Sequence, residues 1–492
     1  MSDKKIKFLG LSIYKRKTKR NKTVFRILNV PVWMKVNSGR KKKYYFLGIK
    51  VYQKKSNTST FFNENSDFIE RKLNNRTAVI DYSISNLLFN LNRIDLKKSE
   101  KLRIHFLYIA DSYWPSWESF YKSCIEDPNL DVKLIFLDTK DTSLHTSQYE
   151  FSESFLIKNN IDYIRYRDYF PDEEKPHVIV YQSPYNVNYD VFKKVRPDFI
   201  VKQGIRIVYI PYGIEYDVSI NNNNLQNLQY NHLVHKLAWN NFVMHSDIKE
   251  GFYNHCQTGG SHVIVSGHPK FDCYFNQKFD LPSDLLKKAK NRKIVAIQIH
   301  CYNDMDCTKK GRIHSVPFEE HLKILNLLKE YKEYFFVYTI HPAYKTRNVE
   351  RNFCSLDDYL SFVSDIKNSD NMYLYQGNHQ ALLANADAFI TENSSLMIEM
   401  AFFDKSVLYL YDVPIAKKPF AQKIADTFHH GHTWIDVQKF IENILFKKDN
   451  FLELRKKYQS DIFPRSLYDG KIGFRIKERI IEKIKEESLY EK

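Results

Sequence analysis

Short apolar runs alternate with amphipathic stretches of helical periodicity from residue 102 onward. Such alternation predicts parallel strands joined by helices. The first series of strands is expected at 103–109, 132–137, 177–181, 206–210 and 262–265. After a charged connector at 284–293, a second series is expected at 294–299, 334–340, 372–375, 388–391 and 406–409. Two consecutive series predict an α/β fold with two Rossmann-type parallel-sheet domains facing a cleft.

The first 55 residues follow a different pattern. Apolar and polar residues alternate in two similar stretches, 5–14 and 43–52, each around a Phe-Leu-Gly turn. This weak repeat predicts a small β-hairpin unit that is used twice. The expected divisions are a basic β-rich module at 1–55, a linker and helix at 56–100, parallel-sheet domains at 101–283 and 284–470, and a C-terminal helix at 471–492.

The basic charge is concentrated in the N-terminal module. The chain has a formal charge of +17. Residues 1–55 contain 18 Lys or Arg and one acid, Asp3, so the remaining residues sum to zero. A basic, aromatic-rich module suits an anionic membrane leaflet or nucleic acid, and a merely solvated basic surface is the third possibility. Because no RNA-recognition signature or Cys/His finger is present, the membrane is the expected partner and nucleic acid is not.

The cysteine pattern and the hydropathy indicate the cellular compartment of the protein. Six scattered cysteines form no regular framework, which fits a reducing compartment. The sequence contains no run of 18 uncharged apolar residues and no signal-peptide core. We therefore expect a cytoplasmic protein that is at most peripherally attached to the inner face of the cell membrane.

Three motifs stand at expected strand-to-helix turns, at 267–272 (GHPKFD), 340–342 (IHP) and 390–395 (ITENSS). Ser394 and Ser395 open an apolar helix, where hydroxyls and free backbone N–H groups suit a diphosphate, although Ser394 alone fits a helix cap. Glu399, one turn later, is placed to accept ribose hydroxyls or is an ordinary exposed acid. His341 is expected to contact a transferring phosphate or to act as an acid or base, with a structural role as the alternative.

The first of these motifs offers two further candidates. His268 and Lys270 follow an expected strand. The cation of Lys270 suits a phosphate, and the alternative is that Lys270 is an ordinary surface residue. Asp272 is expected to stabilise the local turn or the local helix start instead.

The three motifs, in this order and spacing over roughly residues 200–430, resemble the CDP-glycerol glycerophosphotransferase family, the teichoic-acid polymerase and primase group. The resemblance also includes Glu399, Lys405 and the tyrosine-rich strand ending at 409–412. It implies a GT-B fold and transfer of glycerol phosphate, or a related polyol phosphate, from a CDP-activated donor to a hydroxyl of a lipid-linked surface polymer such as teichoic acid or capsule. It implies neither a metal nor another cofactor. The implied donor-binding residues are His268, Lys270, His300, Thr391, Asn393, Ser394, Ser395 and Glu399.

The sequence departs from the family where a base is expected. The family usually has an aromatic-His-Gly after a strand of the first domain, and this chain has Tyr212 there. Tyrosine cannot act as a base near neutral pH unless its pKa is strongly lowered. Asp111, Tyr212 and Glu215 are therefore the acceptor-side candidates beside His341, while Asp111 is equally compatible with a helix cap.

Other histidines and cysteines are weaker signals. His300, Cys301, Cys307 and His314 match no closed zinc pattern, and the histidines at 429, 430 and 432 are expected to be solvated. Two other functions remain open at the level of sequence. One is a GT-B glycosyltransferase that uses a nucleotide sugar for capsule or lipopolysaccharide synthesis, and the other is a non-catalytic nucleotide-binding module.

Overall fold

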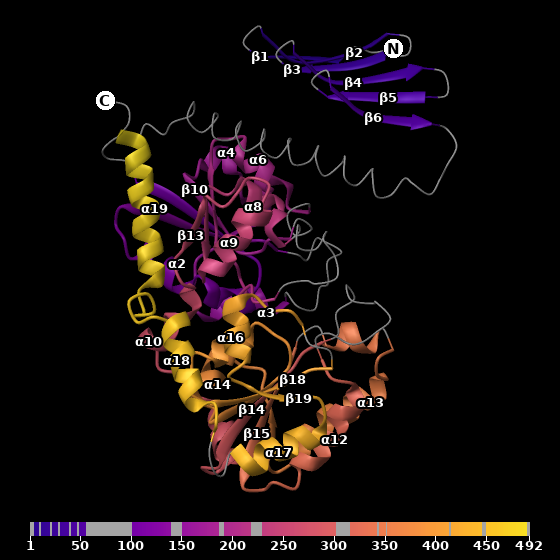
Figure 1. The fold of residues 1–492 in the computed structure, drawn as a ribbon. Helices are drawn as coiled ribbons and strands as arrows, with labels where there is room; N and C mark the ends of the chain where they lie inside the picture. The colour runs from indigo at the N-terminus through magenta and orange to yellow at the C-terminus, as the bar shows by residue number, and fades with distance from the viewer. Residues whose placement is uncertain are drawn as a thin grey trace. The chain divides into compact units, whose positions relative to one another are not determined.

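The computed structural model describes six strands between Lys4 and Lys55, and residues 101–138, 150–185, 191–217, 229–301, 315–341, 344–350, 352–412, 415–444 and 449–489. The chain divides into two compact units, Met1–Thr77 and Ala78–Lys492 (Figure 1). The expected linker and helix at 56–100 lie outside the described residues. The finer domain boundaries remain predictions.

The first unit contains a six-stranded antiparallel sheet in which each strand pairs with the next, in the order β1 to β6 (Figure 1). The strands are β1 (Lys4–Phe8), β2 (Leu11–Lys19), β3 (Lys22–Ile27), β4 (Val30–Ser38), β5 (Lys41–Phe46) and β6 (Ile49–Lys55). The prediction of a β-rich N-terminal module is confirmed. Alternating apolar and polar residues explain the strands, because alternate residues of a strand lie on opposite faces of a sheet.

The hairpin unit occurs three times rather than twice. The pairing register skips one residue in each of three hairpins, at Ile13 in β2, Val32 in β4 and Val51 in β6. These bulges are 19 residues apart in the sequence, so β3 and β4 form a copy between the two that the sequence pattern indicated. Its Phe-Leu-Gly signature is replaced by Ile-Leu-Asn at 27–29, which hides the copy in the sequence.

The second unit begins with a seven-stranded sheet in the order β13-β12-β11-β10-β7-β8-β9. Its strands are β7 (Leu102–Tyr108), β8 (Leu130–Phe136), β9 (Ile164–Arg165), β10 (Val178–Tyr181), β11 (Arg206–Tyr209), β12 (Asn240–Val243) and β13 (Val263–Val265). Its helices are α2 (Glu118–Ile125), α3 (Glu150–Lys158), α4 (Pro171–Glu174), α6 (Pro197–Val201), α8 (Leu233–Leu237), α9 (Ser246–His255) and α10 (Cys273–Asn276). Its 3-10 turns are η1 (Asp111–Ser116), η3 (Tyr166–Asp168), η4 (Lys193–Val195) and η5 (Pro269–Phe271).

The six-stranded sheet that follows has the order β16-β15-β14-β17-β18-β19. Its strands are β14 (Lys293–Ile299), β15 (Tyr334–Ile340), β16 (Met372–Leu374), β17 (Ala388–Thr391), β18 (Ser406–Leu410) and β19 (His429–Gly431). Its helices are α11 (Ser283–Ala289), α12 (Phe318–Leu328), α13 (Leu356–Asn368), α14 (His379–Asn385), α15 (Leu396–Met400), α16 (Pro419–Ala425), α17 (Trp434–Ile444) and α18 (Leu452–Ile462).

The pairings in both of these sheets are parallel, so the predicted two-Rossmann fold is confirmed. In each sheet the strand order reverses beside the first strand, at β7 and β10 in one and at β14 and β17 in the other. Ligands of such sheets bind outside the carboxyl ends of the strands at this reversal. The sequence missed β9, β12 and β19 because none of them is a continuous apolar run.

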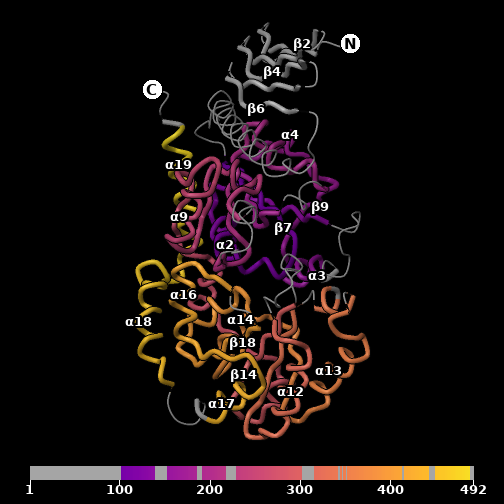
Figure 2. The backbone as a smooth tube through the Cα atoms, turned by 45° about the vertical axis from the view of Figure 1, so that its right-hand side comes forward, coloured from indigo at the N-terminus to yellow at the C-terminus, as the bar shows by residue number. Residues whose placement is uncertain are grey.

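The last helix, α19 (Ile472–Leu489), returns to the first parallel-sheet domain and lies along α2, as Figures 1 and 2 show in yellow. Four buried isoleucines spaced four residues apart form its apolar face, from Ile472 to Ile484. Asp272 fixes its start, because the carboxylate accepts hydrogen bonds from the backbone N–H groups of Ile472 and Gly473 at 3.0 and 2.8 Å. Asp272 therefore stabilises the start of a helix 200 residues away in the sequence, whereas the sequence had placed its role at the local turn or helix start.

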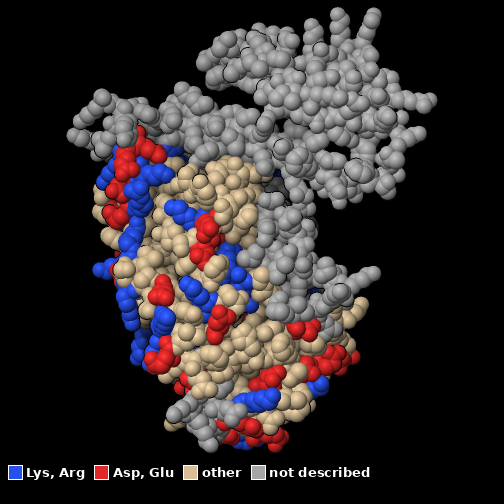
Figure 3. All heavy atoms as spheres, in the orientation of Figure 1, with Lys and Arg blue, Asp and Glu red and all other residues tan. Residues whose placement is uncertain are grey.

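The surface of the second unit is mixed in charge. Figure 3 shows Lys and Arg interspersed with Asp and Glu on the face that it presents. None of the helices in the described ranges is both long and apolar enough to cross a bilayer. Cys124, Cys256, Cys273, Cys301 and Cys354 are buried free thiols.

Candidate active site

Two histidines meet at the carboxyl edge of the second parallel sheet. β14 pairs with β15 on one side and with β17 on the other. His300 follows β14, His341 follows β15, and their ring centroids are 4.6 Å apart. Both side chains are partly exposed. The sequence placed each at a strand end, and the sheet order brings the two together beside the reversal point.

Glu392 organises this edge from the end of β17. One carboxylate oxygen accepts from the backbone N–H of His300 at 2.7 Å. The other accepts from the N–H of Val316 at 2.7 Å and the hydroxyl of Ser315 at 2.8 Å. Its side chain is only 1% exposed, so the carboxylate serves to hold three segments of chain in place. The sequence pattern predicted no role for Glu392 in the site.

A guanidinium reaches the same edge from another segment. Arg347 lies in a short helical turn, Lys345–Val349, and its Nη1 is 3.9 Å from the Sγ atom of Cys301. The same sulfur is 3.5 Å from Nδ1 of His341. Burial raises the pKa of the Cys301 thiol, so it stays neutral beside the imidazole. Sequence reasoning missed Arg347, because nothing in the spacing relates residue 347 to residue 301.

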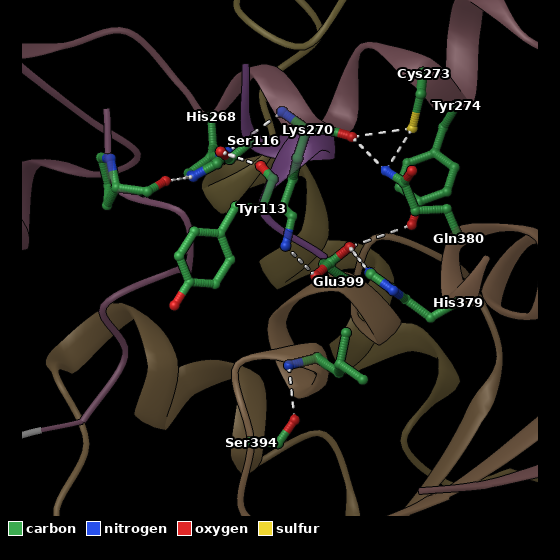
Figure 4. A network of polar contacts seen from close by, with 12 residues as sticks. Tyr113, Ser116, His268, Lys270, Cys273, Tyr274, His379, Gln380, Ser394 and Glu399 are labelled. Atoms are coloured by element: carbon green, nitrogen blue, oxygen red, sulfur yellow. Dashed lines mark hydrogen bonds and ion pairs between the residues drawn. The ribbon is translucent and has the colours of Figure 1, made fainter. Parts of the chain in front are cut away.

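Ser394 and Ser395 have different surroundings. The Oγ atom of Ser394 accepts from the backbone N–H of Leu396 at 3.0 Å, so Ser394 caps the start of α15 (Figure 4). Ser395 is partly exposed. A Cβ atom placed on Gly213, in the loop after β11, would lie 3.9 Å from the Oγ of Ser395. Ser395 therefore lies where the first parallel-sheet domain approaches the second.

Thr391 and Asn393 are fully buried at the end of β17. The Thr391 hydroxyl donates to Oε1 of Gln298 at 2.9 Å, and the Tyr409 hydroxyl donates to Oδ1 of Asn393 at 3.1 Å. Both side chains thus contact protein groups in this structure. Direct donor contacts by these two residues stay a prediction.

Lys270 and Glu399 form an ion pair between the two parallel-sheet domains, as Figure 4 shows at its centre. Nζ of Lys270, which follows β13, lies 2.7 Å from Oε1 of Glu399 in α15, and the two side chains are 6% and 0% exposed. The Tyr274 hydroxyl lies 3.4 Å from the other carboxylate oxygen. The two predicted donor ligands are therefore paired with each other. The pair joins the loop after β13 to the helix that begins at the two serines.

His268 is likewise occupied by protein groups. Its Nε2 donates to the backbone oxygen of Pro211 at 2.9 Å, and its Nδ1 accepts from the backbone N–H of Lys270 at 3.3 Å. Burial, aided by the Lys270 charge, lowers the pKa of His268 to about 3. His268 is a neutral imidazole that ties the loop after β11 to the loop after β13.

Tyr212 and Asp111 lie at strand ends of the first parallel sheet. The Tyr212 ring stacks on Tyr113, with centroids 4.0 Å apart and planes at 16°. Burial raises the pKa of Tyr212 well above its ordinary value, which opposes a role as base. Asp111 is partly exposed at the start of η1, and its Oδ1 accepts from the N–H of Ser112 at 2.8 Å.

Glu215 has the surroundings of a proton-transfer group. Among the described residues, no group hydrogen-bonds to its buried Oε2 atom. Burial raises the pKa of Glu215 to about 7, although the Lys418 charge opposes the shift. The backbone after Glu215 is held by Lys418 of the second domain. The backbone N–H of Lys418 donates to the carbonyl oxygen of Tyr216, and its Nζ donates to the carbonyl oxygen of Asp217, both at 2.8 Å. A carboxyl with a pKa near 7 is suited to exchange protons at neutral pH.

The histidine and cysteine clusters show no metal site in the described part of the chain, where no group of three or more His, Cys, Asp or Glu side chains is arranged to hold an ion. Cys307 and His314 lie outside that part. His429 and His430 belong to β19, where His430 contacts the Tyr411 hydroxyl at 3.2 Å.

Two adjoining parallel-sheet domains with reversal points at β7/β10 and β14/β17 define a GT-B-like protein. Residues 214–415 match the family model of CDP-glycerol:poly(glycerophosphate) glycerophosphotransferase, which confirms the resemblance seen in the motifs. No curated protein matches the chain.

Several solved structures are similar to this chain. The UDP complex of S. aureus MnaA is 13% identical, with a TM-score of 0.53 over 76% of this chain and 94% of that one. A UDP-N-acetylglucosamine 2-epimerase is 13% identical, with a TM-score of 0.51 over 78% of this chain and 96% of that one. The wall teichoic acid polymerase TagF is 12% identical, with a TM-score of 0.47 over 86% and 98%. At these identities the first two likenesses establish the fold alone.

Proposed function

We propose that this chain is a transferase that moves glycerol phosphate, or a related polyol phosphate, from a CDP-activated donor to a hydroxyl of a lipid-linked cell-surface polymer. The family match carries this proposal. It spans residues 214–415 and so contains every candidate residue except Asp111 and Tyr212. The match also includes the carboxyl ends of β14, β15 and β17, where the second parallel sheet is expected to bind a ligand.

The donor would lie over the carboxyl ends of β14, β15 and β17. His300, His341 and Ser395 are partly exposed there, and Arg347 brings a cation to the same edge. The acceptor oxygen would attack the outer phosphorus of the donor, and CMP would leave with the electrons of the broken P–O bond. Preorganised N–H donors and cations would stabilise the charge that develops on the phosphoryl oxygens and on CMP.

Glu215 is the group that we assign to the acceptor proton. Its carboxylate would accept the proton of the attacking hydroxyl, for which a pKa close to the working pH is favourable. The loop that carries Glu215 approaches Ser395, as the neighbouring Gly213 shows. This approach supports a base that is supplied by the first domain.

The basic N-terminal module would hold the enzyme at the inner face of the cell membrane, where a lipid-linked acceptor is found. Its excess of 17 positive charges suits an anionic leaflet. Concentrating the enzyme at that surface would raise its rate of encounter with the acceptor.

A donor screen tests the proposed activity. The full chain is incubated with radiolabelled CDP-glycerol, other CDP-polyols and UDP-sugars in the presence of a lipid-linked polyol-phosphate acceptor. We expect release of CMP and labelled polymer from a CDP-polyol, and loss of both with Glu215→Gln but not with Glu250→Gln, a change at an exposed residue of α9. Sugar transfer from a UDP-sugar would instead make the chain a glycosyltransferase. Nucleotide binding without turnover of any donor would make it a binding module.

A further inference from the structure

The N-terminal sheet has two chemically different faces. Residues paired across neighbouring antiparallel strands lie on the same face, so the register assigns each strand position to one side. One side, the aromatic face, holds the equivalent repeat positions Tyr14, Trp33 and Tyr52. The other side, the basic face, holds Lys17, Lys43 and Lys55.

The two faces differ in how charge is distributed over them. The basic face has Lys or Arg at eleven of its strand positions, spread over every strand except β4, and no acidic residue. The aromatic face has twelve apolar or aromatic positions and five basic ones. The division is clearest in the first and third hairpin copies, because the middle copy has only two cations on the basic face, Lys22 and Arg26. Most of the charge of the module is therefore gathered on one side of the sheet.

We propose that the basic face is a docking surface for the phosphate groups of an anionic membrane. Its Lys and Arg positions are distributed over five of the six strands, and neighbouring strands are about 4.8 Å apart, which suits an extended charged surface better than a single polymer strand. A bilayer interface also needs no pocket, and the meander of β1 to β6 has none of the closed topology that encloses a ligand. This inference deepens the membrane part of the proposed function and does not depend on donor chemistry.

Neighbouring residues offer a matched test in the full-length chain. One triple variant, Lys17→Gln/Lys43→Gln/Lys55→Gln, removes three cations from the basic face. The control, Arg16→Gln/Lys42→Gln/Lys54→Gln, removes three from the aromatic face at adjacent positions of the same strands β2, β5 and β6. Both lose the same net charge. Flotation with phosphatidylglycerol–phosphatidylcholine vesicles, against pure phosphatidylcholine, measures binding, and circular dichroism checks folding.

We expect the basic-face triple to bind anionic vesicles on the order of 100-fold more weakly than the wild type. The affinity of the control for anionic vesicles should fall by less than about 5-fold. The charges that it removes are on the far face of the sheet, about one Debye length from the lipid at 0.1 M salt. Equal losses, or a larger loss in the control, would overturn the assignment to the basic face. Absence of vesicle binding by the wild type, with binding to soluble heparin, would assign the face to a soluble polyanion instead. CMP release with a soluble acceptor should be the same in all three proteins, which separates this test from failure of the proposed activity.

Discussion

The buried ion pair between Lys270 and Glu399 allows a prediction whose size follows from its surroundings. Lys270→Met removes the ammonium group and keeps most of the side-chain volume. The Glu399 carboxylate is fully buried, and among the described residues its other polar contacts are the Tyr274 hydroxyl at 3.4 Å and the His379 Nε2 at 4.0 Å. Breaking a buried pair by removing one partner costs about 3–5 kcal/mol, because an uncompensated charge is left inside.

A double-mutant cycle measures this cost. Urea unfolding of the wild type, Lys270→Met, Glu399→Gln and the double variant is followed by circular dichroism. We expect Lys270→Met to lower the free energy of unfolding by about 3–5 kcal/mol, and Glu399→Gln to recover a large part of that loss in the double variant, because the amide carries no charge to be desolvated.

A surface pair of the same chemistry is the control. Lys122 and Glu118 are 2.6 Å apart, but the lysine side chain is 50% exposed. Lys122→Met should therefore change the free energy of unfolding by less than about 1 kcal/mol. The reasoning is refuted if Lys270→Met costs no more than Lys122→Met, or if the cycle shows no coupling between residues 270 and 399.

Three further predictions concern the site and the last helix. Because burial raises the pKa of Glu215 to about 7 and the carboxylate is the active form, kcat/KM should rise about tenfold per pH unit below 7 and level off above it. Lys418→Met should move that inflection upward, since Lys418 lowers the pKa, and an unmoved inflection would assign it to another group. Ser394→Ala should lower the free energy of unfolding by about 1 kcal/mol, because the α15 cap is lost. Ser395→Ala should weaken binding of CDP and leave the free energy of unfolding unchanged. Calorimetry that shows the reverse would exchange the roles of the two serines. Gly473→Ala would bring a Cβ within 2.3 Å of the backbone nitrogen of Phe120, so a loss of about 1–3 kcal/mol is expected on urea unfolding, with Glu478→Ala on the same helix as the near-neutral control.

The strands that the sequence predicted are those with continuous apolar runs. All ten expected strands of the two parallel sheets are present, with ends shifted by at most two residues. β12 begins with Asn240 and Asn241, which disfavour a strand, yet both are buried between β11 and β13. Their strand conformation depends on the hydrogen bonds of neighbouring strands, which a single sequence does not contain.

The candidate residues were predictable as members of motifs, but their exposure was not. Polar residues after strands of an alternating α/β pattern are expected at one edge of the sheet, and His300 and His341 do lie together there. His268 looked available for a phosphate, but its ring nitrogens bind backbone groups of Pro211 and Lys270. The carbonyl of Pro211 is 57 residues away in the sequence, so no local pattern indicates this contact.

The sequence by itself determined the two α/β series, the strand ends that carry polar motifs and the concentration of positive charge in the first 55 residues, because periodicity, turn residues and charge are local properties. Only the tertiary structure decided which of those polar groups are used internally. Lys270 meets Glu399, and Glu392 holds His300, through contacts between distant segments. Burial elsewhere in the fold raises the pKa of Glu215 to about 7. Strand register likewise decided that the N-terminal hairpin occurs three times and that its charge lies mainly on one face, because a residue's face depends on pairing as well as on the order of residues.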